Sequence, residues 1–400
     1  KCLVGSEICI RDRFNALHRC KDRTNIVNFK IKILFDSYHL YHLPQFEPLI
    51  DLLSTDDRFD IFHSTSNDIP IEEYKLCTAV LRNKPGTLVV AETESDRQRK
   101  IKNLNLDFFI CGWSRYDIDK YVTKKTYVGM IYHGIGIKPS YWLDNHKRLD
   151  MRFVESKYRV QQLIQNGIKT NLELTGFIKL DPIFQKNKID INSIKQKYKL
   201  DHGKKTILFA PTFYPSSVEP IGMKLGEYTK EYNVLIKPHL WTTFLKNFAE
   251  INHNKKNRIF RGLTEHYPHI HLIPPEDYNI IPFFKIADVL LTEASSTSYE
   301  MLACNKPVIV NRFFKLKTSH RIFRSRLYRK RLNLEMEKDI SNFCFEAHEP
   351  NDIPVAIDMA LNKFGSKQDK IKEYRKRMFF KLDGLAAFRA RDTILSYKNK

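Results

Sequence analysis

The stretch DVLLTEASSTSYEMLACNKPVIVN, residues 288–311, decides the fold predicted for this chain. It divides into an apolar run at 288–292, a polar loop at 293–297, a helix-like segment at 298–304 and a second apolar run at 308–310. Short apolar runs on either side of a helix are typical of two parallel strands and their crossover connection. The stretch therefore predicts a strand–loop–helix–strand unit of a parallel sheet.

The polar loop of this unit carries three hydroxyl side chains, Ser295, Ser296 and Thr297. Ligands of open parallel sheets bind at the carboxyl ends of the strands. A helix start adds unpaired N–H groups and a partial positive charge, which favour a phosphate. We expect these hydroxyls to hold the diphosphate of a nucleotide-activated donor. The alternative is a helix-capping cluster without a ligand, because Ser and Thr favour that position for structural reasons.

Short apolar runs recur on both sides of this stretch, with helix-like segments between them. Strands at this spacing argue for parallel sheets covered on both faces, and 400 residues suffice for two domains. The predicted strands lie at 30–35, 60–64, 78–81, 87–91, 106–111, 127–132, 152–155 and 172–175, then at 205–210, 232–236, 270–273, 288–292, 308–310 and 343–347.

The pattern predicts an α/β fold of GT-B type. Two Rossmann-like domains would face each other across a ligand cleft, and a C-terminal helix would return to the first domain. The predicted parts are an N-terminal appendage or helix at 1–28, an acceptor-side domain at 29–195, a nucleotide-donor domain at 196–350 and returning helices at 351–400.

The chain is strongly basic, since 67 lysines and arginines against 46 acidic residues give a net charge of +21. This balance predicts a polyanionic partner, which is a membrane surface, a phosphorylated substrate or a nucleic acid. The segment 320–331, HRIFRSRLYRKR, suits anionic lipid headgroups or a polyphosphate chain; the alternative is a solvated basic helix. Because no nucleic-acid-binding module accompanies it, we expect no nucleic-acid partner.

No apolar run approaches the roughly 18 residues that a membrane-spanning helix needs, and no signal peptide with an apolar centre is present. The seven cysteines lack metal or redox spacing, which is typical of reduced side chains. We expect a cytoplasmic protein that associates peripherally with the inner face of the cell membrane.

Two histidines follow predicted strands and are candidates for catalysis. His133 precedes Gly134 and Gly136, which let backbone approach a bound acceptor closely, and a histidine at a strand end is well placed as a general base. His239 follows the second-half strand at 232–236 and could donate a hydrogen bond to a phosphate. The structural alternatives are a loop histidine that caps a carbonyl and a simple turn.

Four further polar residues stand at strand ends or just beyond. Thr212 could donate its hydroxyl to a phosphate, and Lys179 could pair with one. Asp181 could orient a catalytic histidine or, alternatively, cap a helix before Pro182. Glu300, one turn into the helix after the phosphate loop, could reach a ribose hydroxyl or remain solvated.

Metal and cofactor motifs are missing from the sequence. His266, His269 and His271 lie near one another, but no cysteine or carboxylate completes a metal-site spacing. Neither a GxxxxGK[ST] loop nor a GxGxxG turn after a strand occurs. We expect no tightly bound metal and no cofactor, with the activated donor as a substrate.

Six short motifs follow one another along the chain. They are His133-Gly134, Gly176-x-x-Lys179-x-Asp181, Ala210-Pro211-Thr212, Lys237-Pro238-His239, Thr292-Glu293-Ala294-Ser295-Ser296 and Asn305-Lys306-Pro307. Taken in this order, they resemble the CDP-glycerol glycerophosphotransferase family of teichoic-acid and capsule polymerases. The segment 380–389, FKLDGLAAFR, is loosely similar to the closing signature of that family.

The resemblance implies a transfer from CDP-glycerol to a hydroxyl of a surface polysaccharide or teichoic-acid-like polymer, with CMP leaving. It makes His133 the base, His239 the second active-site histidine, and Ser295 with Ser296 the diphosphate-binding pair. Two departures concern the acceptor and the leaving fragment. The family usually follows its His-Gly with Thr-Pro, where this chain has 135–136 as Ile-Gly, and it places an aspartate and an aromatic where 293–294 are Glu-Ala.

Two other functions are compatible with the sequence. A GT-B glycosyltransferase that uses a CMP- or UDP-linked sugar in capsule or lipopolysaccharide synthesis would share the fold and the phosphate loop. A basic module that binds membrane or polyanionic polymer without catalysis would explain the net charge. Donor turnover separates the three possibilities.

Overall fold

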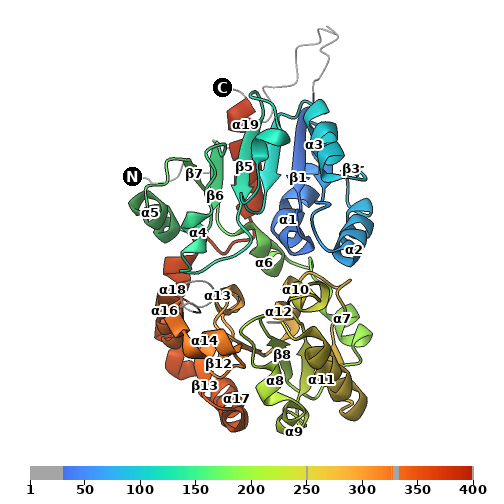
Figure 1. Cartoon of the computed structure of the whole chain (residues 1–400). Coiled ribbons are helices and arrows are strands. Elements are labelled where there is room, and N and C mark those ends of the chain that lie inside the picture. The colour runs from blue at the N-terminus through green and yellow to red at the C-terminus, as the bar shows by residue number, and fades with distance from the viewer. Residues whose placement is uncertain (1–29, 249–250, 326, 328–332, 399–400) are drawn as a thin grey trace, which may run out of the picture. The chain divides into compact units, whose positions relative to one another are not determined.

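The computed structural model describes residues 30–248, 251–325, 327 and 333–398, and the chain forms one compact unit from Ile31 onward. Its strands make two sheets, in which every strand pair is parallel (Figure 1). Helices connect successive strands and cover both sheets. The predicted α/β class is therefore confirmed.

The first sheet has seven strands. They are β1 (Ile31–Asp36), β2 (Phe59–Ser64), β3 (Thr87–Val89), β4 (Phe108–Cys111), β5 (Tyr127–Ile131), β6 (Met151–Val154) and β7 (Asn171–Leu174). Their order across the sheet is β3-β2-β1-β4-β5-β6-β7. Strands β1 and β4 are buried on both faces, as their continuous apolar sequences predict.

One predicted strand is wrong, because residues 78–81 lie inside helix α2 (Ile71–Arg82). Cys77 and Leu81, four residues apart, are both buried on one face of this helix. A short apolar run cannot be distinguished from the buried face of a helix by periodicity alone. Acidic side chains in the first turn favour the helix through its dipole.

The second sheet has six strands, in the order β10-β9-β8-β11-β12-β13. They are β8 (Thr206–Ala210), β9 (Asn233–Ile236), β10 (Ile270–Leu272), β11 (Val289–Thr292), β12 (Val308–Asn311) and β13 (Phe345–Ala347). Thr292, at the end of β11, pairs with Ala210 on one side and Val310 on the other. The stretch 288–311 thus supplies two central strands of this sheet.

Helix α13 (Ser296–Ala303) begins two residues earlier than predicted. Ser295 has extended backbone angles and takes the N-cap position. Ser296 and Thr297 therefore belong to the first turn of the helix, where backbone N–H groups lack intrahelical partners.

The remaining helices connect the strands or follow them. In the first half they are η1 (Leu40–His42), α1 (Leu43–Leu53), α3 (Glu94–Asn103), η2 (Ile118–Lys120), α4 (Ser140–Leu143), α5 (Lys157–Gln165), η3 (Ile178–Leu180), α6 (Asp181–Phe184) and α7 (Ile191–Lys197). In the second half they are α8 (Val218–Ile221), α9 (Lys224–Tyr228), α10 (Leu240–Phe244), α11 (His253–His266), α12 (Ile281–Ile286), α14 (Thr318–Ile322), α16 (Leu334–Ser341), η4 (Pro350–Asp352), α17 (Ile353–Asn362), η5 (Phe364–Lys367), α18 (Gln368–Met378) and α19 (Ala386–Lys398).

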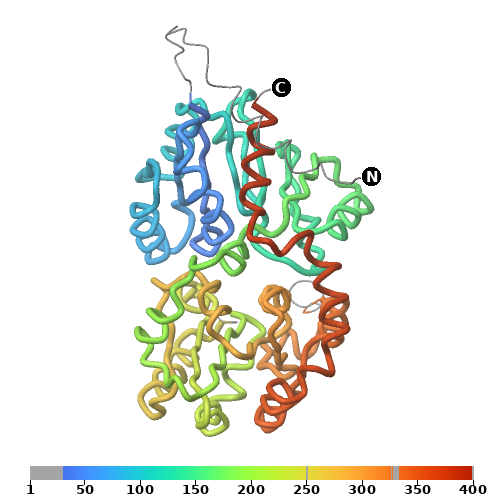
Figure 2. The backbone as a smooth tube through the Cα atoms, turned by 180° about the vertical axis from the view of Figure 1, so that it is seen from behind, coloured from blue at the N-terminus to red at the C-terminus, as the bar shows by residue number. Residues whose placement is uncertain are grey.

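The C-terminal helix returns to the first sheet, as predicted. Helix α18 packs against α13 and α5, and α19 packs against α1 (Figure 2). Ala387, Ala390 and Ile394 of α19 belong to the same buried cluster as strand β1. The small alanine side chains let the helix approach its neighbours closely, and burial of apolar surface stabilises the contact.

Several predicted boundaries remain predictions. The first sheet ends at Leu174 and the second begins at Thr206, on either side of the predicted boundary between residues 195 and 196. The predicted appendage at 1–28 lies outside the described residues, as do residues 326 and 328–331 of the basic segment. Within the described ranges, no helix combines the length and apolarity that a membrane crossing requires.

Candidate active site

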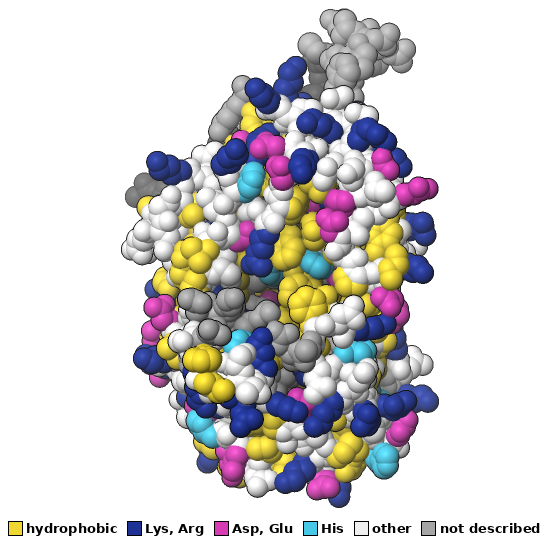
Figure 3. Space-filling model, in the orientation of Figure 1, with side chains coloured by type: hydrophobic (Ala, Val, Ile, Leu, Met, Phe, Trp, Pro, Cys, Tyr) yellow, Lys and Arg dark blue, Asp and Glu magenta, His cyan; other side chains and the backbone are white. Residues whose placement is uncertain are grey.

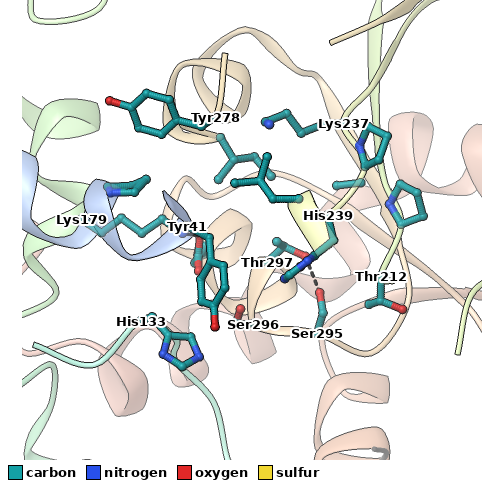
Figure 4. A pocket seen from close by; sticks show the side chains of 17 residues that line it. Tyr41, His133, Lys179, Thr212, Lys237, His239, Tyr278, Ser295, Ser296 and Thr297 are labelled. Atoms are coloured by element: carbon teal, nitrogen blue, oxygen red, sulfur yellow. Dashed lines mark hydrogen bonds and ion pairs between the residues drawn. The ribbon is translucent and has the colours of Figure 1, made fainter. Parts of the chain in front are cut away.

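A cavity at the carboxyl ends of both sheets collects most of the predicted site residues (Figure 4). His133 follows β5, His239 follows β9 and Ser295 follows β11. We call it the central cavity, and its walls are Tyr41, Pro44, His133, Lys179, Ala210, Pro211, Thr212, Lys237, Pro238, His239, Leu240, Tyr278, Ile280, Ser295, Ser296, Thr297 and Glu300. The imidazole of residue 133 and the hydroxyl-bearing turn therefore line one space.

His133 has a defined tautomer. Its Nδ1 lies 3.1 Å from the carbonyl oxygen of Gly112, and because a carbonyl only accepts, Nδ1 carries the hydrogen. Burial lowers the pKa of His133 to about 3, so the ring is neutral at pH 7. A neutral ring protonated on Nδ1 has its lone pair on Nε2. His133 can therefore accept a proton through Nε2.

His239 has the opposite tautomer. The backbone N–H of Trp241 donates to its Nδ1 over 3.1 Å, so that nitrogen carries the lone pair. Burial lowers the pKa of His239 to about 3, with the nearby His133 as a further cause. The hydrogen of this neutral ring is therefore on Nε2, and His239 can donate a hydrogen bond to an anion.

Tyr41 lies between the two histidines. Its ring centroid is 5.3 Å from that of His133 and 5.6 Å from that of His239. His42, the next residue, is fully buried beside His133, with 5.0 Å between the ring centroids. These rings shield the partly buried imidazoles from solvent, in keeping with burial as the largest cause of their low pKa values.

The hydroxyls after β11 form a connected cluster at the start of α13. Thr292 donates to the carbonyl of Ala210 over 2.7 Å, and the hydroxyl oxygens of Ser295 and Thr297 are 2.5 Å apart. Within the described residues, no protein group pairs with the Ser296 hydroxyl. The cluster presents hydroxyl and backbone donors to the cavity, which suits a phosphate.

Lys179 and Glu300 form a buried ion pair across the cavity. Lys179 Nζ in η3 is 2.6 Å from Glu300 Oε2 in α13. Glu300 Oε1 is buried without a hydrogen-bond partner among the described residues. An unsatisfied buried acceptor is costly and is commonly completed by a ligand or water. Lys179 is thus held by a carboxylate, and its predicted contact with a phosphate stays a prediction.

Thr212 lines the central cavity, but its hydroxyl is engaged elsewhere. It donates to the carbonyl of Pro215, and the Thr212 backbone N–H donates to Glu293 over 2.6 Å. Glu293, fully buried, also accepts from the backbone N–H and hydroxyl of Ser217 over 2.7 and 2.6 Å. Thr212 and Glu293 thus shape the loop after β8, and the predicted contact of Thr212 with a phosphate stays a prediction.

Two lysines, the buried Lys237 and the half-buried Lys138, supply positive charge. Lys237 lines the central cavity, and Lys138 lines a neighbouring cavity that shares His133, His239 and Ser295 with it. Burial lowers the pKa of each lysine to about 8. No carboxylate pairs with either lysine among the residues that the structure describes. An incoming anion would stabilise both charges.

The two predicted glycines differ in position. Gly134 lines the neighbouring cavity, where an added Cβ would lie 3.0 Å from the Tyr141 hydroxyl. Gly136 lines neither cavity; it has φ +129°, and an added Cβ would lie 2.9 Å from the Tyr299 ring. Gly136 therefore makes a close packing contact, and its predicted approach to an acceptor stays a prediction.

Asp181 is the predicted catalytic residue that the structure places elsewhere. It does not line the central cavity. Its carboxylate accepts from the backbone N–H groups of Ala386 and Ala387 over 3.1 and 2.7 Å. The charge thus caps the returning helix α19, 205 residues further along the chain. The alternative prediction, that Asp181 caps a helix, is confirmed, but the capped helix is α19 and not a helix at Pro182.

Replacement of Asp181 by alanine is expected to destabilise the protein while leaving turnover per folded molecule nearly unchanged. The loss of two charge-assisted hydrogen bonds from a buried cap should cost about 2–3 kcal/mol. Urea unfolding measures this change, and Asp383→Ala, which removes an exposed partner of Arg389, is the control with a smaller loss. A large fall in kcat with unchanged stability would instead support a catalytic role for Asp181.

Acidification is expected to destabilise the fold through His133 and His239. Both have a folded pKa of about 3 against an ordinary value of 6.5. Between these values the unfolded chain binds more protons, so stability is complete above pH 6.5 and decreases as the pH falls. At pH 4.5 each histidine should lower the free energy of unfolding by on the order of 2 kcal/mol relative to neutral pH.

Urea midpoints between pH 7 and 4.5 measure this effect in the parent and in the double variant His133→Gln/His239→Gln. The glutamines do not titrate, so the variant should lose less stability on acidification. Other titrating groups, including Asp181, cancel in the comparison. Equal pH dependence of the two proteins would contradict the neutral assignment.

Metal ligation receives no support from the described residues, where no group of three or more His, Cys, Asp or Glu side chains could hold an ion. The expectation of a reaction without a bound metal or cofactor stays a prediction.

Two Rossmann-like sheets with a cavity at their carboxyl ends define a GT-B-type fold. Solved structures support this fold. The wall teichoic acid polymerase TagF, in a variant soaked with CDPG, matches over 93% of this chain and 90% of its own, with 13% identity and a TM-score of 0.63. MnaA of S. aureus with UDP matches over 92% and 97%, with 16% identity and a TM-score of 0.57.

UDP-GlcNAc 2-epimerase from Neisseria meningitidis, bound to UDP-GlcNAc, matches over 92% of this chain and all of its own, with 14% identity and a TM-score of 0.55. The family model of CDP-Glycerol:Poly(glycerophosphate) glycerophosphotransferase matches residues 138–314. The predicted resemblance to this family is thereby confirmed over these residues. The match includes His239 and the serine loop and begins five residues after His133. A search of curated proteins gives no match.

Sequence reasoning missed several residues around the cavity. Tyr41 and His42 lie in η1 directly after β1, and Lys138 follows the His133 loop. The sequence could have indicated Tyr41 and His42, because the segment 37–42, SYHLYH, directly follows a predicted buried strand, as His133 does. The strand-end argument that selected His133 applies equally to this segment.

Proposed function

We propose that this protein transfers glycerol phosphate from CDP-glycerol to a hydroxyl of a surface polymer. The observation that carries the proposal is the pairing of His133 with the Ser295–Thr297 turn in one cavity. The family match supplies the donor class, and the hydroxyl cluster, the helix start and Lys237 provide sites for a diphosphate.

In the proposed reaction, the acceptor oxygen attacks the glycerol-bearing phosphorus of CDP-glycerol. A new P–O bond forms, the bond from that phosphorus to the bridging oxygen breaks, and CMP leaves with the bridging oxygen. Nε2 of His133 takes the hydroxyl proton. Catalysis of this kind rests mainly on positioning and electrostatic stabilisation.

The two histidine tautomers suit different steps. His133 accepts at Nε2, as a base requires, whereas Nε2–H of His239 donates to a diphosphate oxygen. The negative charge of the donor would raise the pKa of His133 toward the working pH, because an opposite charge favours the protonated ring. His133 would thus become a competent base only when the donor is bound.

In the proposed reaction, Glu300 would accept a hydrogen bond from a ribose hydroxyl of the donor. Its Oε1 is a buried acceptor without a partner in the described part of the chain, while Lys179 fixes its other oxygen. A ribose hydroxyl donates a hydrogen bond and would satisfy this acceptor.

Donor turnover tests the proposal. The protein is incubated with an acceptor polymer and, separately, with CDP-glycerol, a CMP-sugar and a UDP-sugar, and nucleotide release is followed by phosphorus NMR. CMP from CDP-glycerol together with a new phosphodiester is the expected result. Release from a nucleotide sugar alone would establish a glycosyltransferase, and no release from any donor would favour a non-catalytic basic module.

We also propose that the protein works at the inner face of the cell membrane, where a lipid-linked acceptor would be present. The net charge of +21 supports attraction to an anionic surface. Co-sedimentation with phosphatidylglycerol vesicles, but not with phosphatidylcholine vesicles, is the expected result at low salt. Equal sedimentation with both would contradict an electrostatic membrane site.

A further inference from the structure

A second large cavity borders the active site, and no part of the proposed reaction uses it. We call it the aromatic groove and define it by Tyr38, His39, Trp113, Tyr116, Trp241 and Phe248. It encloses about 730 Å3, within the range of about 300–1,000 Å3 that is typical of organic-ligand sites. The groove therefore has room for a sizeable ligand.

Aromatic rings form the floor of this groove. The ring of Tyr38 stacks on Tyr116 with 5.1 Å between centroids, and it lies 5.3 Å from Trp113. The side chain of Phe248 is 50% exposed. Hydrophobic side chains and histidines gather in the middle of the face drawn in Figure 3, with lysines and arginines mostly around them. Flat rings at a wet surface favour ligands with both an apolar face and polar edges.

The charge of the aromatic groove differs from that of the central cavity. Its lining contains one cation, Arg115, and one carboxylate, Asp68. The central cavity and its neighbour contain Lys138, Lys179 and Lys237. A chain of glycerol phosphates carries a negative charge on every unit and has no apolar face. The groove is therefore poorly suited to such a chain.

The groove leads to the proposed base. Arg115, Tyr214 and Trp241 line both the aromatic groove and the neighbouring cavity that contains His133. A chain lying in the groove could thus present its end to His133. In the proposed function the hydroxyl cluster and Lys237 of the central cavity hold the donor, so the groove would lie on the acceptor side.

A polar anchor stands in the groove wall. His39 Nδ1 is 3.1 Å from Oε1 of the fully buried Glu73. A carboxylate accepts, so His39 Nδ1 carries the hydrogen when the ring is neutral, and its Nε2 has the lone pair. Nε2 can accept a hydrogen bond from a ligand hydroxyl. A small number of oriented polar groups in a mainly aromatic wall is typical of specific small-molecule sites.

We propose that the aromatic groove binds pyranose rings of a glycan acceptor, whose terminal hydroxyl then reaches His133. Pyranose rings carry C–H groups on their faces and hydroxyls at their edges, which matches stacked aromatic rings and the His39 anchor. The proposal rests on the proposed function and specifies its acceptor: the glycerol phosphate is added to sugar, and not to a bare glycerol-phosphate chain.

Tryptophan fluorescence can report this binding without any donor. Two of the three tryptophans, Trp113 and Trp241, line the groove, and Trp142 lies in α4 outside it. In a Trp142→Phe protein, the emission comes from the groove alone. The protein is titrated with maltohexaose, chitohexaose, a synthetic glycerol-phosphate trimer and phosphatidylglycerol vesicles.

A saturable emission change with at least one oligosaccharide, and none with the trimer, is the expected result. In the same background Phe248→Ala should weaken oligosaccharide affinity about three- to tenfold, and because this side chain is half exposed the fold should persist. Phe388→Ala, an exposed phenylalanine on α19, is the matched control. Affinity for CDP-glycerol should be unchanged in both.

Saturation by the trimer, a response to vesicles alone, or no response to either oligosaccharide would overturn the glycan assignment. These outcomes are independent of donor turnover. If oligosaccharide binds and CMP is never released, the groove proposal stands and the proposed reaction fails. If glycerol phosphate is transferred onto the trimer with release of CMP and no glycan binds, the reaction stands and the groove proposal fails.

Discussion

Alanine in place of His133 is expected to lower kcat about 10²- to 10⁴-fold, the usual contribution of a general base. The side chain is partly buried at the cavity and its Nδ1–H donates to the Gly112 carbonyl, which cannot replace Nε2 as the acceptor of the hydroxyl proton. CDP-glycerol should still bind with nearly the parent affinity, because the hydroxyl turn is unaltered. CMP release under saturating donor measures kcat, and calorimetry measures donor affinity.

His202→Ala is the matched control for this variant, because that histidine is exposed in the loop before β8. The control should retain parent kcat. Circular dichroism and urea unfolding establish that the His133 variant is folded. Full activity in a folded His133→Ala protein would exclude this side chain as the base and would direct attention to other groups in the cavity.

The double variant Ser295→Ala/Ser296→Ala is expected to weaken CDP-glycerol binding about 10²-fold or more. Each hydroxyl donated to a charged phosphate contributes about 1.5–3 kcal/mol. The N–H groups at the start of α13 remain, so the donor site should be impaired without being abolished. Calorimetric titration with CDP-glycerol gives the dissociation constant directly.

Ser366→Ala, an exposed serine in η5, serves as the control with unchanged affinity. The fold of the double variant should persist, because Ala294 and α13 keep their buried packing. If the double variant binds CDP-glycerol as the parent does, the turn after β11 is a capping cluster only. The diphosphate would then have to lie against Lys138 and Lys237.

The sequence predicted the parts of the site that depend on strand ends. His133, His239 and Ser295 each follow an apolar run that forms a central strand. Because the carboxyl ends of parallel strands share one edge of a sheet, placing them together required only the correct fold class. The first sheet, apart from residues 78–81, followed from the same reasoning.

Contacts between distant segments could not be predicted in this way. The Lys179–Glu300 pair joins residues 121 positions apart, and the Asp181 cap reaches residues more than 200 positions further on. Neither follows from local spacing, because both depend on how the second sheet and the last helix pack. Asp181 next to a proline was indistinguishable from a catalytic carboxylate without its partners.

The histidine tautomers were also inaccessible from the sequence. They depend on a carbonyl of Gly112 and an N–H of Trp241, which are backbone groups that every residue carries. Only the folded geometry decides which ring nitrogen faces each group.

The low pKa of His133 has a consequence for how the proposed reaction would reset between turnovers. A proton taken from the acceptor would be retained only while phosphate charge lies beside the ring. Once CMP departs, the pKa of the imidazole would return to about 3, and the proton would be released to solvent at any physiological pH. In the proposed reaction, departure of the nucleotide and recovery of the unprotonated ring would thus be one coupled event.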